Sequence, residues 1–205
     1  MKRIFIAVIA LVIQGCVTYP TYPADNALKI TDIPTKLDSK NEKEMVWKSI
    51  KDIYSALGLK NERAIDIGNI EDYDLRVEKG NLKTSCEQKV IAIATGDIES
   101  AFCSGSIFIA RGNVTISHSS KNIIIASGSV NIAHDGDDDD GSLVISNKNV
   151  KISHAAGSTV YAVDGLEISF SNKVTAFNTS SRKTSWGHIN NIEIKPLFKN
   201  EPSHL

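Results

Sequence analysis

Three histidines at regular spacing are the residues in this sequence best placed to do chemistry together. His118, His134 and His154 recur at nearly equal intervals, the second interval being slightly the longer. If each repeat adds one layer of chain, the three rings lie about 5 Å apart and could share a metal ion. The same column begins with Phe102 and ends with Phe170. A position filled by either Phe or His is typical of an aromatic stacking ladder, so we expect a ladder and keep a metal or catalytic site as the alternative.

An acidic loop at residues 135–141 is the second chemical signal. Its carboxylates are Asp135, Asp137, Asp138, Asp139 and Asp140. Oxygen ligands of this kind bind Ca²⁺, but Asp140 stands where an EF-hand has Gly, and no Glu closes the loop. We therefore expect a solvated acidic turn and no cofactor, with bound Ca²⁺ as the alternative. Because like charges this close repel, we also expect a counter-ion or a basic partner.

These residues belong to a repeat that runs through the second half of the chain. The segments 91–94, 107–110 and 123–126 resemble one another at a regular step, and 143–146 and 159–162 continue the series. One step is longer than the others, and the extra residues fall in the acidic loop. A second column holds Val114, Val130 and Val150, with polar residues alternating between apolar ones. Such alternation predicts half-buried β-strands.

Two short strands per repeat, with Gly, Asn, Asp and Ser at the corners, predict a mainly β fold. We expect a short-coil β-solenoid of about six 16-residue rungs. Its first strands are apolar on both faces: Phe108 and Ile124 alternate with residues such as Ile107 and Ile109. A strand of this kind is covered on both sides, either by a helix of the same chain, which we favour, or by a partner chain.

Cys86 and Cys103 are separated by one rung, with an offset of a single position. Neighbouring rungs place Cα atoms near the separation that a disulfide requires. We expect a Cys86–Cys103 disulfide, with two unpaired buried thiols as the alternative.

An amphipathic helix precedes the repeat. Val46, Ile50, Ile53 and Leu57 follow the helical period, Asp38 or Ser39 can cap its start, and Gly58 can end it. We divide the chain into a signal peptide (1–15), a cysteine with an extended tether (16–38), the helix with an N-terminal cap (39–86), and the solenoid with its C-terminal cap (87–205). The helix packs on the solenoid or caps it.

The first residues predict export. Lys2 and Arg3 precede an apolar run, 4–13, that is too short to span a bilayer. The run ends in Ile-Gln-Gly-Cys, which resembles the lipobox of bacterial lipoproteins, although Gln14 is unusual at its position. The resemblance implies cleavage before Cys16 and lipidation of Cys16. With Val17 after the cysteine, it also implies an outer-membrane lipoprotein facing the periplasm or the cell surface.

Charge and motifs limit the function. A net charge of −1 without a basic stripe argues against nucleic-acid binding, and common hydrolase and phosphate-binding motifs are absent from the sequence. We expect no enzymatic activity but a binding or scaffolding module for envelope structure, adhesion or toxin neutralisation. Its partner would be an envelope protein or glycan, or a second copy in a homo-oligomer. An enzyme or binding protein acting on envelope polysaccharide is the alternative.

Overall fold

The computed structural model describes residues 40–56, 67–85, 87–137, 139–178 and 184–196. The predicted signal peptide, Cys16, the tether, Cys86 and Asp138 lie outside these residues. Within the described ranges, no helix has the length and apolar character needed to cross a bilayer.

One α-helix and a series of short strands make up the described chain. The helix α3 covers Lys40–Ala56, inside the predicted range, and a 3-10 turn, η3, covers Ile70–Asp72. The strands are β1 (Asp74–Glu78), β2 (Leu82–Thr84), β3 (Glu87–Gln88), β4 (Val90–Ala94), β5 (Ile98–Ser104), β6 (Ile107–Ala110), β7 (Val114–Ser120), β8 (Ile123–Ala126), β9 (Val130–Asp135), β10 (Leu143–Ser146), β11 (Asn149–Ala156), β12 (Thr159–Ala162), β13 (Gly165–Asn178) and β14 (Thr184–Pro196).

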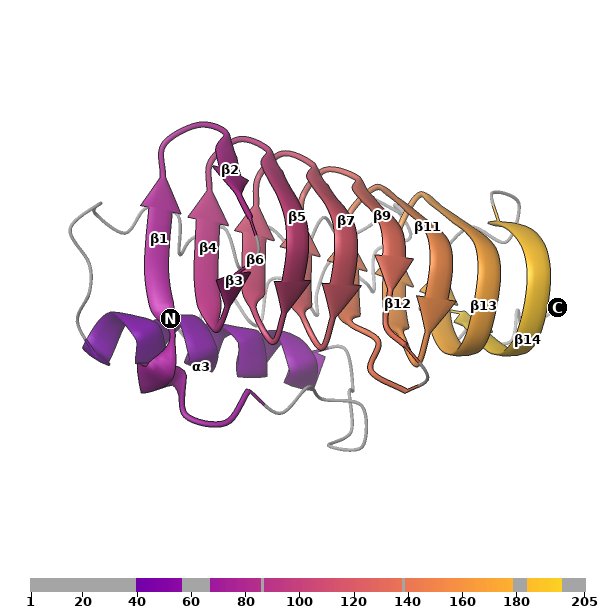
Figure 1. Cartoon of the computed structure of the whole chain (residues 1–205), viewed down its shortest axis with the longest axis horizontal. Helices are drawn as coiled ribbons and strands as arrows, with labels where there is room; N and C mark the ends of the chain where they lie inside the picture. The colour runs from indigo at the N-terminus through magenta and orange to yellow at the C-terminus, as the bar shows by residue number, and fades with distance from the viewer. Residues whose placement is uncertain (1–39, 57–66, 86, 138, 179–183, 197–205) are drawn as a thin grey trace, which may run out of the picture.

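The strands stack in parallel as successive coils of a solenoid (Figure 1). One side follows the order β1-β4-β6-β8-β10-β12, and the other follows β2-β5-β7-β9-β11-β13. Val114 lies beside Val130, which lies beside Val150, so the predicted column is present. The mainly β fold and the parallel β-solenoid of about six turns are therefore confirmed.

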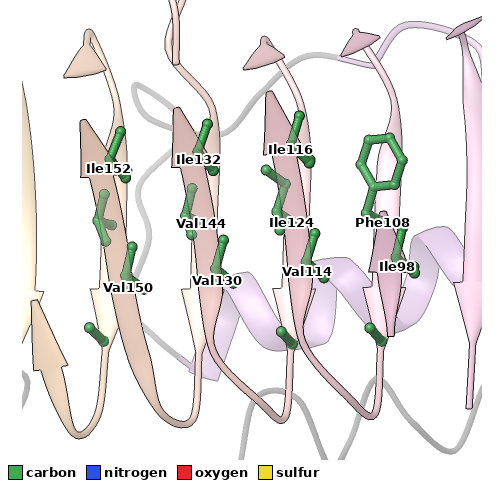
Figure 2. Close-up of a cluster of buried hydrophobic side chains, with 14 of the residues drawn as sticks. Ile98, Phe108, Val114, Ile116, Ile124, Val130, Ile132, Val144, Val150 and Ile152 are labelled. Atoms are coloured by element: carbon green, nitrogen blue, oxygen red, sulfur yellow. The ribbon is translucent and has the colours of Figure 1, made fainter. Parts of the chain in front are cut away.

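The main core lies inside the coil. Figure 2 shows how each rung contributes equivalent side chains from both strands, so that Val114, Val130 and Val150 repeat along the axis. Phe108 and Ile124 face this interior and are at most 1% exposed. A core built from stacked columns explains why the strands keep their register from rung to rung, even where a corner is longer.

A second buried cluster lies on the outer face of the strand series β4, β6, β8 and β10. It combines Ile91, Ile107 and Ile123 with Val46 and Ile50 of α3. All five side chains are fully buried. The outward apolar side chains of these strands are thus part of a second apolar layer.

Parallel pairing extends beyond the predicted solenoid boundary. At the N-terminal end, β1 pairs with β4 and β2 with β5, in the same register as the later rungs. At the other end, β14 pairs with β13 along most of its length, although the step from Leu166 to Thr184 is slightly longer than the step from Val150 to Leu166. The segments expected to be caps therefore include rungs of the same coil.

A left-handed backbone conformation recurs at one corner of the coil. Lys89, Gly105, Lys121, Gly157 and Lys173 have φ values between 53° and 71°. They occupy one column of the repeat, where the chain turns from one strand series to the other. Lysine rarely adopts this conformation, so the corner imposes it regardless of residue type.

Candidate functional site

The ring column forms a continuous ladder on the outside of the solenoid. Centroids of Phe102 and His118 are 4.5 Å apart, and those of His154 and Phe170 are 4.7 Å apart. His134 lies 5.6 Å from both of its histidine neighbours. The rings stack as the repeat predicts, one from each of β5, β7, β9, β11 and β13.

The ladder is one ring longer than the sequence predicts. His188 of β14 stacks on Phe170 at 5.5 Å. Regular spacing does not find this ring, because the step from Phe170 to His188 is longer than the step from His154 to Phe170. The register of β13 with β14 pairs Phe170 with His188 and so restores the column.

The ladder faces solvent, mostly by ring edges. Phe102 is 54% exposed and Phe170 is 44% exposed, both unusual for large apolar side chains. Because inner rings have a neighbour on each face, they present edges rather than faces to a partner. The ladder, defined here as Phe102, His118, His134, His154, Phe170 and His188, is therefore a narrow strip of aromatic edges and imidazole nitrogens.

Charges beside the ladder are paired. A second outward column lies three residues before the rings in the same strands. In this column, Lys83 Nζ lies 2.7 Å from Glu99 Oε2, and Lys151 Nζ lies 2.8 Å from Glu167 Oε1. The hydrogen bond and charge of Glu99 raise the pKa of Lys83 above its ordinary value. Exposed pairs such as these contribute little stability, but they leave this side of the strip without net charge.

The histidines do not form a metal centre as they stand. Within the described residues, no group of three His, Cys, Asp or Glu side chains is arranged to hold a metal ion. His134 Nε2 instead lies 3.0 Å from Asp137 Oδ1. The geometry supports the stacking interpretation and leaves the metal or catalytic site as an untested alternative.

Three described carboxylates of the acidic loop, those of Asp137, Asp139 and Asp140, have basic partners within the chain. Lys173 Nζ lies 2.8 Å from Asp139 Oδ1, and Lys121 Nζ lies 2.9 Å from Asp140 Oδ1. Both lysines are corner residues with left-handed backbone. With Asp137 beside His134, the carboxylates point to separate partners rather than to one point. Calcium binding stays a prediction.

Asp135, the first acid of the loop, is inside the coil and not in the turn. Its Oδ2 accepts hydrogen bonds from the Ser158 hydroxyl at 2.6 Å and from the Ser142 backbone N–H at 3.1 Å. Burial raises the pKa of its carboxyl, and these hydrogen bonds oppose the rise. A fully buried acid anchors the root of the loop but cannot meet a dissolved substrate.

A buried polar column continues from Asp135 along the same corner. The Asn122 side-chain amide donates to Ser119 Oγ at 2.8 Å and to the Cys103 carbonyl at 2.9 Å, while its Oδ1 accepts from Ser106 N–H at 2.8 Å. We did not predict this column. The signal was present, because Ser106, Asn122, Ser142 and Ser158 share one place in the repeat.

The cysteine prediction concerns one described and one undescribed residue. Cys103 is buried, and its Sγ lies 2.6 Å from Ser100 Oγ. The register places Glu87, not Cys86, directly beside Cys103. Cys86 lies outside the described residues, so the disulfide stays a prediction.

Fold and surface together define a parallel β-solenoid that carries a solvent-facing ring ladder. No family model, curated protein or solved structure matches the chain.

Proposed function

We propose that the chain is a membrane-anchored envelope lipoprotein whose solenoid is a non-catalytic binding or scaffolding module. The observation that carries the proposal is the exposed ladder on a stacked-strand scaffold. Aromatic side chains and imidazoles held in fixed positions lose little conformational entropy when a partner binds. The ladder is the contact surface of the module.

The anchor rests on the lipobox-like segment ending at Cys16. Thioether-linked and amide-linked acyl chains together would hold the protein stably at a membrane. Growth with an alkyne-tagged fatty acid should label the full chain, and Cys16→Ser should abolish the label and release the protein from the membrane fraction. Labelling that persists in Cys16→Ser would reject the anchor.

The role of the ladder can be tested in cells. A photo-crosslinking amino acid at His118, whose side chain is exposed, should give a discrete adduct. The same probe at Lys48, on the exposed side of α3, is the matched control. Equal adducts from both positions, or none from His118, would count against the ladder as a contact surface.

We assign no reaction to the chain. The strongly perturbed acid, Asp135, is fully buried within the coil. Binding or cleavage of envelope polysaccharide remains the second candidate, since imidazole edges can hydrogen-bond to sugar hydroxyls. Release of reducing ends from purified envelope polysaccharide would favour an enzyme, whereas retention without cleavage would favour a glycan-binding module.

The helix α3 completes this proposal as a permanent cover of the outer apolar face. Val46, Ile50 and Ile53 share a buried cluster with the strand isoleucines, which supports a cover from the same chain over a partner chain. Burial of a large aliphatic side chain contributes about 1.5–3 kcal/mol. Ile50→Asp should therefore strongly destabilise the solenoid, whereas Lys48→Asp should not.

A further inference from the structure

We infer that the partner of the ladder is a second copy of this chain, packed ladder against ladder with the two solenoid axes antiparallel. The inference rests on the proposed role of the ladder as a contact surface, and it names the occupant of that surface. Three features carry it: the repeat distance along the ladder, the order of its rings, and the charge beside it.

The repeat distance of the ladder limits what can match it ring for ring. Rings recur once per rung, and rungs of a β-stack lie about 4.7–4.9 Å apart. An extended peptide lying along the axis presents side chains on one face only every ~6.6 Å, so it falls out of step within two rungs. Another parallel β-stack has the same repeat distance as the ladder. A second solenoid can therefore meet the rings from Phe102 to Phe170 in register.

Five of the six rings, from Phe102 to Phe170, have the same order in both directions, and His188 extends beyond them. From Phe102 to Phe170 the column reads Phe, His, His, His, Phe, with His134 at its centre. A two-fold axis through His134 places Phe102 of one copy against Phe170 of the other, and His118 against His154. Such an isologous contact is the commonest way in which protein chains pair. It also covers both exposed phenylalanines with apolar surface.

The charges beside the ladder permit this approach. Glu99 and Glu167 are related by the same two-fold axis, and each already has a lysine partner, at 2.7 Å and 2.8 Å. At the centre, Asn131 is the outward residue of the His134 rung. When two copies of the ladder pack together, the outward column that holds Glu99 and Glu167 therefore brings no unpaired like charges against each other.

Site-specific crosslinking of the full chain in membranes tests the arrangement. Single cysteines replace His134, Phe102 or Lys48, and a bismaleimide shorter than four rungs is added. In the antiparallel pair, the two positions 134 face each other, whereas the two positions 102 are four rungs, roughly 19 Å, apart. We expect dimers from His134→Cys, dimers from Phe102→Cys only when it is mixed with Phe170→Cys, and only background from Lys48→Cys.

Each other outcome overturns the inference. Dimers from both single variants, Phe102→Cys and His134→Cys, would show parallel axes. Background at every position would show that the ladder does not pair with itself. Since His134→Cys also removes the contact with Asp137, Ala133→Cys, an exposed neighbour in the same rung, repeats the test without that change.

The mass of the detergent-solubilised full chain provides a second measurement. Phe102→Asp should raise the dimer dissociation constant by at least about tenfold, because it places a carboxylate against an apolar ring. Met45→Asp, which alters an exposed apolar residue of α3, should leave it unchanged. A monomeric wild-type chain would overturn the inference. If the probe at His118 then crosslinked to a different protein, the proposed function would still stand.

Discussion

The backbones of neighbouring rungs approach each other closely at Gly112, and adding a single methyl group there should separate them. A Cβ at Gly112 would lie 2.8 Å from the carbonyl carbon of Gly96 and 2.9 Å from the backbone nitrogen of Asp97. These are backbone atoms of the preceding coil, which cannot rotate away. Gly112→Ala therefore has to widen the spacing between two rungs.

The cost follows from what the widening breaks. Gly112 N–H donates to the Gly96 carbonyl at 2.9 Å, and Asn113 N–H donates to Asp97 Oδ1 at 2.6 Å. Each lost hydrogen bond costs about 1 kcal/mol, and overpacking adds about 1–3 kcal/mol. We expect Gly112→Ala to lower the free energy of unfolding by about 3–5 kcal/mol.

The matched control is Gly105→Ala. Gly105 has φ of 59°, and a Cβ there would meet no atom of the described residues within 4 Å. It should cost only the left-handed backbone penalty of about 1 kcal/mol. Equilibrium urea unfolding followed by circular dichroism measures both, and Gly128→Ala should repeat the larger effect. If Gly112→Ala costs no more than Gly105→Ala, the close stacking of the corners is not what holds the rungs together.

Three further outcomes are expected. Burial raises the pKa of the Asp135 carboxyl, so the folded chain binds the carboxyl proton more tightly than the unfolded chain does, and stability falls as pH rises from the unfolded-state pKa of about 3.8 through the raised folded-state pKa. Thermal unfolding between about pH 4 and about pH 8 should show that Asp135→Asn removes this fall. Tyr54→Phe should leave the free energy of unfolding unchanged or raise it by up to ~1 kcal/mol in urea titrations, since the Tyr54 hydroxyl is buried and has no hydrogen-bond partner among the described residues, and a clear loss would contradict this. Phe108→Ala should cost about 3–5 kcal/mol in the same titrations, because its ring is 1% exposed inside the coil, and a cost under about 1 kcal/mol would argue against the interior position.

The repeat made the architecture predictable. Side chains alternate along a strand with a period of two, so the column of Val114 could be assigned to the interior from spacing alone. The same period puts the ladder on the inner face, but two consecutive outward residues, Ser117 and His118 in one rung, break the alternation and turn the rings outward. The ladder followed from the same register. Equal spacing is a strong signal because one shifted residue would turn every side chain of a rung to the opposite face.

The corners were harder to predict. The charge of Asp135 groups it with the acidic loop, although its place in the repeat, shared with Cys103 and Ser119, is an inward one. Likewise, residue type alone does not predict left-handed backbone at Lys121; only its column, shared with Gly105 and Gly157, does. At such positions the register is a better guide than the chemistry of the side chain.

The extra residues in the acidic loop show that a corner can lengthen while the strands on both sides keep their pairing. A whole coil should be as easy to add as a longer corner. Duplicating residues 107–122 in tandem would insert one more layer, whose side chains match the layers above and below it. The particle would then be about 4.8 Å longer, so gene duplication can extend the length of this protein in fixed increments.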